Sequence, residues 1–158
     1  IFHLNREGEA PAEPHREGRH GGESEAPAET TGVVIAVTAR APAENIANLR
    51  AAGAEVCVIE EENERVCLAA LMREFGRREI TSVLIEGGGE VNASALKAGI
   101  VDKVMFFIAP KLIGGKNAPG PIGGEGIRHL SQAFSLRDVE ITPINGDFLI
   151  EGYLNHET

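Results

Sequence analysis

The residues with the clearest capacity for chemistry lie in Val83–Ser94, VLIEGGGEVNAS, where an apolar strand runs directly into three glycines and then a helix. Consecutive glycines permit positive φ and let a ligand approach the backbone closely. The following helix presents free N–H groups and the positive end of its dipole. This combination predicts a phosphate or pyrophosphate site. The spacing matches neither GxGxxG nor GxxxxGK[ST], so a tight turn without a ligand is the alternative interpretation.

Two charged residues stand at the ends of predicted strands. Glu86 follows the strand at the carboxyl edge of the sheet, where open α/β folds place ligands. Its carboxylate can accept hydrogen bonds from an aminopyrimidine or from ribose hydroxyls, or it can simply be an exposed loop acid. Lys111 follows the strand that ends at Pro110 and can neutralise a ligand phosphate. The alternative for Lys111 is a solvated side chain.

The elements that must position these residues alternate along the chain. Apolar runs and helical spacing predict strands at 32–38, 55–59, 80–85 and 102–109, and helices at 42–52, 64–77 and 90–98. Such repeats imply a mostly parallel sheet with helices on both faces. Two further strands, 136–142 and 147–154, flank an Asn-Gly pair that is typical of an antiparallel hairpin. We therefore expect an α/β fold with a mixed sheet.

Three segments differ in composition. Residues 1–5 have the pattern of a strand remnant, and residues 6–31 contain the repeats EAPAE and REG with no large apolar side chain after Arg6. The second segment is expected to be a flexible insertion, because it cannot bury enough surface to offset the entropy of ordering. Residues 32–158 form the expected domain. Within it, the glycine-rich stretch Gly114–Gly126 is interpreted as a lid or a dimer contact.

Composition excludes several classes of function. The net charge of −9 argues against nucleic acid as a partner. Cys57 and Cys67 are ten residues apart, which fits neither a zinc half-site nor a redox pair, so no metal is expected. Two thiols without an evident partner suit the reducing cytoplasm. No stretch has the length of a membrane span.

The glycine stretch Val83–Asp102, the segment Ile108–Gly115 (IAPKLIGG) and the closing strand Asp147–Leu154, in this order and spacing, resemble one known family. It is the reductase domain of the bacterial bifunctional riboflavin-biosynthesis deaminase/reductase, which has a dihydrofolate-reductase-like fold. The resemblance extends from about Gly32 to Leu154.

This resemblance implies an oxidoreductase that uses NADPH to reduce the ribosyl group of 5-amino-6-(5-phosphoribosylamino)uracil to ribityl, with hydride delivered to C1 of the ribose. It implies that Glu86 contacts the substrate. Lys111 is a second candidate for the substrate, and Thr38, at the end of its strand, is a candidate for the cofactor. The loop that the resemblance assigns to the cofactor phosphates comprises Gly88, Gly89, Glu90, Val91, Asn92, Ala93 and Ser94, and Gly87 is a further candidate for the cofactor. The family usually forms homodimers.

The sequence also departs from the family pattern. The family's upstream strand–helix–strand segment, with its Leu-Asp-Gly motif, has no counterpart here, and no zinc-deaminase motif occurs. Two other functions therefore remain open: an inactive remnant that binds nucleotide or only dimerises, and a related reductase with another pterin-like or pyrimidine substrate. Arg40 is one candidate for recognising the 2′-phosphate of NADPH.

Overall fold

The computed structural model describes residues 2–6, 32–115 and 117–155, so most of the predicted insertion, 7–31, lies outside the described residues. The chain divides into two compact units, one formed by Leu4–Ser82 and the other by Ile1–His3 with Val83–Thr158. Strand β1 (Phe2–Arg6) pairs with β6 (Ile80–Ile85).

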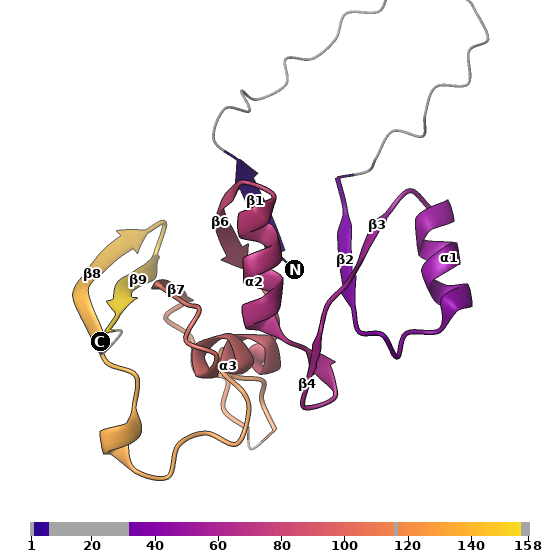
Figure 1. The fold of residues 1–158 in the computed structure, drawn as a ribbon. Coiled ribbons are helices and arrows are strands. Elements are labelled where there is room, and N and C mark those ends of the chain that lie inside the picture. The colour runs from indigo at the N-terminus through magenta and orange to yellow at the C-terminus, as the bar shows by residue number, and fades with distance from the viewer. Residues whose placement is uncertain (1, 7–31, 116, 156–158) are drawn as a thin grey trace, which may run out of the picture. The chain divides into compact units, whose positions relative to one another are not determined.

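Residues 34–58 of the unit Leu4–Ser82 form a strand–helix–strand motif. Strands β2 (Val34–Val37) and β3 (Glu55–Val58) pair in parallel, from Val34↔Glu55 to Val37↔Val58. Helix α1 (Ala43–Ala51) connects them and packs against β3 (Figure 1). It begins after Pro42 and is followed by Gly53 at φ 86°, a conformation that ends helices. The start and stop signals predicted for this helix are confirmed.

The next predicted helix, 64–77, starts later than expected. A small hairpin precedes it, formed by β4 (Glu61–Glu62) and β5 (Arg65–Val66). Its two turn residues have positive φ, 49° at Asn63 and 62° at Glu64. Helix α2 (Leu68–Arg77) therefore begins only after this turn, and it buries Leu71 and Phe75, as helical spacing predicted.

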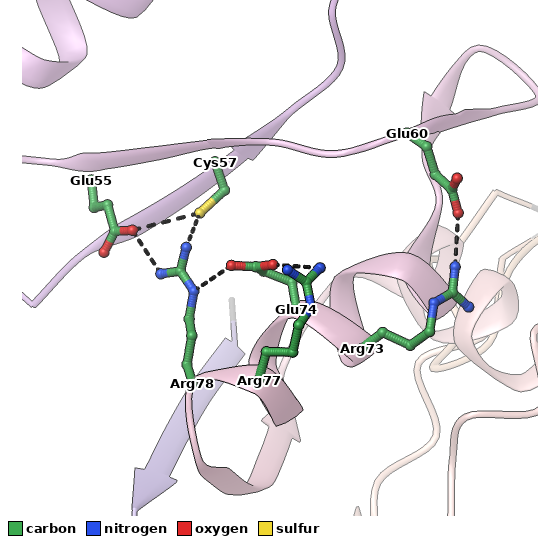
Figure 2. Close-up of polar contacts among 7 residues, drawn as sticks. All are labelled: Glu55, Cys57, Glu60, Arg73, Glu74, Arg77 and Arg78. Atoms are coloured by element: carbon green, nitrogen blue, oxygen red, sulfur yellow. Dashed lines mark hydrogen bonds and ion pairs between the residues drawn. The ribbon is translucent and has the colours of Figure 1, made fainter.

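Arg78 links the end of α2 to β3 (Figure 2). Its guanidinium lies 2.8 Å from the Glu74 carboxylate, 2.7 Å from that of Glu55 and 2.7 Å from Sγ of Cys57. The hydrogen bond between Arg78 and Glu74 raises the pKa of Arg78 and lowers that of Glu74. Burial raises the pKa of the Cys57 thiol, although the neighbouring arginine opposes this effect. The cluster thus couples strand and helix through a neutral thiol and charged side chains.

The other unit contains one helix, a 3₁₀ turn and a three-stranded sheet among its described residues. These elements are α3 (Gly89–Lys97), β7 (Lys103–Ile108), η1 (Leu130–Gln132), β8 (Leu136–Ile144) and β9 (Asp147–Leu154). Strand β9 lies between β7 and β8 and is antiparallel to both (Figure 1). The β8–β9 turn has φ of 49° at Asn145 and 94° at Gly146, so the predicted Asn-Gly hairpin is confirmed.

The pairing of β7 differs from the expected strand order. Its position after a strand and a helix suggested another parallel strand, but β7 is antiparallel to β9, from Lys103↔Tyr153 to Ile108↔Phe148. Among the pairs whose register the described residues define, only β2–β3 is parallel. The α/β class and the mixed strand directions are confirmed, and the correction concerns the direction of β7 alone. The placement of helices on both faces of one sheet stays a prediction.

Tyr153 on the central strand β9 connects all three strands of this sheet. Its ring centroid lies 5.5 Å from the ammonium of Lys103 on β7 and 5.1 Å from the guanidinium of Arg137 on β8. Lys103 also pairs with Glu151 at 2.5 Å, and this hydrogen bond raises the pKa of Lys103. The two cations therefore help to fix the register of the sheet.

Candidate functional site

The predicted strand–glycine–helix arrangement is present at the end of β6. The strand ends at Ile85, Glu86 follows as an exposed residue, and α3 begins at Gly89. Gly88 is the N-cap, and its carbonyl accepts hydrogen bonds from the N–H groups of Val91 at 3.0 Å and Asn92 at 3.2 Å. The local structure on which the phosphate-site prediction depends is confirmed.

The backbone N–H groups of the three loop glycines are candidate donors to a ligand. In the described part of the chain, no residue accepts a hydrogen bond from the N–H of Gly87, Gly88 or Gly89. Gly88 is exposed, and a Cβ built there would meet no atom within 4 Å. The loop therefore has an open side at Gly88, next to the positive end of the α3 dipole, which suits a phosphate group.

The other side of the loop is covered by the segment Gly120–Gly124. The carbonyl of Gly89 accepts a hydrogen bond from the N–H of Gly123 at 2.9 Å. The Glu90 carboxylate accepts one from the N–H of Gly124 at 2.9 Å, and the Asn92 side chain donates one to the carbonyl of Pro121 at 2.9 Å. Sequence reasoning missed these contacts. It interpreted the surrounding glycine-rich stretch only as a lid or a dimer contact.

Close packing explains two of the glycines in this region. A Cβ at Gly89 would lie 2.9 Å from the nitrogen of Gly123 and 3.0 Å from the oxygen of Gly120. A Cβ at Gly87 would lie 2.7 Å from Cβ of Val91, a side-chain atom in the first turn of α3. A glycine at either position is therefore required by packing. Packing does not require a glycine at Gly88, because a Cβ there would meet no neighbouring atom. In the sequence, the only sign that the start of α3 contacts the segment Gly120–Gly124 was that glycines cluster in both.

The remaining residues of the predicted cofactor loop serve the helix itself. Ser94 donates its hydroxyl hydrogen to the carbonyl of Glu90, one turn earlier in α3, at 2.8 Å. Ala93 faces Gly124, because a Cβ on that glycine would lie 3.2 Å from the Ala93 methyl. Buried Ala95 and Leu96 then anchor the next turn of α3.

Two other predicted site residues are far from the loop in sequence. Lys111 is exposed in the same unit, three residues after the end of β7, and its N–H donates to the carbonyl of Ala109 at 2.8 Å. Thr38 belongs to the other unit, and its hydroxyl accepts a hydrogen bond from the N–H of Arg40 at 3.4 Å. The guanidinium of Arg40 lies 3.2 Å from Glu61 and 3.5 Å from Glu64. Those carboxylates compensate the charge expected to recognise a 2′-phosphate.

With the fold and the geometry of the glycine loop described, comparison with known proteins identifies the family. The sequence profile of the RibD C-terminal domain matches residues 24–150, so the chain belongs to this family. Its homologues are enzymes of riboflavin biosynthesis. The chain is 44% identical over 108 residues to riboflavin biosynthesis protein RibD of Actinobacillus pleuropneumoniae, covering 68% of this chain and 29% of that protein. It is 36% identical over 104 residues to 2,5-diamino-6-ribosylamino-4(3H)-pyrimidinone 5′-phosphate reductase of Aquifex aeolicus, covering 66% and 46% respectively.

Solved structures support the same fold. RibD of Acinetobacter baumannii matches with a TM-score of 0.60 and 18% identity, covering 89% of this chain and 36% of that one. A pyrimidine reductase-like protein of Corynebacterium diphtheriae matches with a TM-score of 0.61 and 22% identity, covering 78% and 50%. The dihydrofolate-reductase-like fold is thus confirmed. The chain spans less than half the length of the two curated relatives described above.

No helix in the described ranges is both long and apolar enough to cross a bilayer.

Proposed function

We propose that this chain forms the cofactor side of a reductase site that converts the ribosylamino group of 5-amino-6-(5-phosphoribosylamino)uracil into a ribitylamino group. The family match over residues 24–150, together with the open glycine loop after β6, carries this proposal. NADPH, when bound, supplies the hydride that reduces C1 of the ribose. The protein's own contribution is to bind, orient and keep water from the reacting groups.

The residues present fit a dinucleotide phosphate. The N–H groups of Gly87, Gly88 and Gly89 and the start of α3 would hold the diphosphate, because these donors have no acceptor in the described ranges and Gly88 has open space beside it. In this proposal Glu86 contacts the substrate's pyrimidine or ribose. Lys111, exposed after β7, faces the substrate phosphate as a cation. Thr38 stays a candidate for the cofactor on the sequence prediction alone.

A second substrate is favoured by one comparison. The Aquifex aeolicus relative is named for 2,5-diamino-6-ribosylamino-4(3H)-pyrimidinone 5′-phosphate, which carries an amino group on the ring where the uracil carries an oxygen. Both compounds present the same phosphorylated ribosylamine to the reducing centre, so the loop alone does not separate them. The uracil compound is our first choice, because a bacterial RibD matches with the higher identity of 44%.

The test begins with binding and then measures turnover. Purified chain is titrated with NADPH and separately with NADH by nicotinamide fluorescence, and oxidation of the bound coenzyme is then followed with each of the two pyrimidines. We expect NADPH binding and oxidation with the uracil compound. Absence of binding at millimolar NADPH would show that this chain has no working cofactor site and would favour the inactive remnant.

We also propose that the protein is a cytoplasmic homodimer. The β7–β9–β8 sheet leaves large apolar side chains exposed on both faces: Met105 and Phe107 on one, and Ile108, Ile141 and Phe148 on the other. Exposed apolar surface of this kind is typical of an interface. Sedimentation equilibrium should give twice the chain mass of 16.8 kDa, and a purely monomeric species would refute the proposal.

A further inference from the structure

We propose that Glu90 and Asn92 are positioning residues that hold the segment Gly120–Gly124 against the first turn of α3. The segment then forms a fixed wall beside the phosphate loop. This inference rests on the proposed function of that loop and gives both side chains a role other than direct contact with the cofactor.

Three hydrogen bonds of 2.9 Å join this segment to the start of α3. One is between backbones, from Gly123 to Gly89, whereas the other two use the side chains of Glu90 and Asn92. Between β7 and η1 the described residues form no helix or strand. The position of the segment must therefore come from contacts of this kind, and the bond to the carboxylate is of the stronger, charge-assisted type.

The charge of Glu90 favours this role over direct phosphate contact. A carboxylate that faced a diphosphate would repel it, because both groups are negative. In the structure the Glu90 carboxylate instead accepts the N–H of Gly124. The contact directs the carboxylate to a backbone donor on the segment, so an acid can stand in the first turn of the helix without occupying the phosphate site.

The geometry of Gly123 shows how closely the two parts fit. A Cβ at this position would lie 2.7 Å from Oε1 of Glu90 and 3.1 Å from the carbonyl carbon of Gly89. A methyl group there must displace the Glu90 carboxylate from its position and widen the backbone contact with α3 by a few tenths of an ångström. Gly123→Ala therefore disturbs the contact between the segment and the first turn of α3 without changing Glu90 or Asn92. It is an independent test of whether the segment is held in a fixed position.

The experiment uses the full chain and two readouts, amide hydrogen exchange at Gly123 and Gly124 by NMR and NADPH affinity by fluorescence. For Glu90→Ala we expect exchange about tenfold faster and an NADPH dissociation constant about tenfold higher, as for loss of one charge-assisted hydrogen bond. Glu90→Gln should restore both, since its amide oxygen can accept the same N–H. Glu125→Ala is the matched control, because this exposed acid has no hydrogen bond or ion pair in the described part of the chain.

The outcomes separate the two proposals. If amide exchange at Gly123 and Gly124 is unchanged in Glu90→Ala, the positioning role is wrong. It is also wrong if Glu90→Gln exchanges at the wild-type rate but has lost its affinity for NADPH. Should Glu90→Ala fail to fold, Asn92→Ala and Gly123→Ala must each accelerate exchange, or the inference is wrong. A wild-type chain that binds no NADPH refutes the proposed function, while the exchange rates still decide whether Glu90 and Asn92 hold the segment.

Discussion

Adjacent glycines in the loop should respond in opposite ways to the same substitution. At Gly89, the added methyl would lie 2.9 Å and 3.0 Å from backbone atoms of Gly123 and Gly120, which no side-chain rotation can relieve. At Gly88 the methyl meets nothing within 4 Å, and the backbone there, at φ −69° and ψ 170°, suits any residue. We therefore expect Gly89→Ala to cost stability and Gly88→Ala to cost binding.

The sizes of the two effects follow from these distances. Overpacking costs about 1–3 kcal/mol, and for Gly89→Ala a gain of up to about 1 kcal/mol in helix propensity offsets part of it. The free energy of unfolding should thus fall by roughly 1–2 kcal/mol. For Gly88→Ala, a loss of about 0.5 kcal/mol at the N-cap and a similar gain from the stiffer unfolded chain should nearly cancel. Its methyl nevertheless stands on the open face, so NADPH affinity should fall at least about tenfold.

Urea denaturation followed by circular dichroism measures the first quantity, and NADPH fluorescence titration the second. Gly89→Ala should lower the urea midpoint, whereas Gly88→Ala should leave it near that of the wild type. If Gly88→Ala binds NADPH normally, the diphosphate does not lie on that face of the loop. If Gly89→Ala is as stable as Gly88→Ala, the segment Gly120–Gly124 does not pack on α3 closely enough to exclude a side chain at Gly89.

Three further predictions concern the side chains that hold each unit together. Arg78→Met should lower the free energy of unfolding by about 1–2 kcal/mol in urea denaturation, since the Arg78–Glu74 pair is only 21% and 19% exposed. Unchanged stability would mean that the cluster in Figure 2 contributes nothing. The pKa of Glu74 is lowered from 4.5, so the ionised carboxylate stabilises the folded state above pH 4.5, and this stabilisation is lost as the pH falls through the lower pKa of the folded protein. Glu74→Gln removes the titrating group, so the melting temperature of this variant should decline less steeply in acid. Burial raises the pKa of Cys57 from 9.0, so the neutral thiol contributes its full stability below pH 9.0, and this contribution is lost as the pH rises through the higher pKa of the folded protein. Cys57→Ala should therefore lose less stability than the wild type as the pH rises above 9.0. An equal loss in both proteins would contradict the raised pKa of the thiol.

Much of the fold could be predicted because its signals are local. Strands 80–85 and 147–154 were predicted with their observed bounds, since apolar and β-branched runs indicate strands. Pro42 and Gly53 marked the ends of α1, and Asn145–Gly146 marked the hairpin turn. Each of these features depends on the backbone preferences of a few neighbouring residues.

The features that were missed depend on context. The hairpin at Glu61–Val66 is rich in Glu and Arg, which favour helices, so its positive-φ turn was hidden by composition. The antiparallel pairing of β7 with β9 joins segments that follow different local patterns. The contact of Glu90 with Gly124 spans 34 residues across a stretch without periodicity, so nothing in the sequence indicated it.

The exposed apolar side chains on both faces of the β7–β9–β8 sheet also affect how readily the purified protein aggregates. Phe107 is 68% exposed and Ile141 is 63% exposed, so these side chains provide an apolar surface through which molecules can self-associate. The formal charge of −9 at pH 7 opposes it by mutual repulsion, and that repulsion vanishes near the isoelectric point of about 5.0. Light scattering should accordingly rise as a sample is acidified toward pH 5.0 or as salt screens the charge, and buffers of neutral pH and low ionic strength are the ones in which to store it.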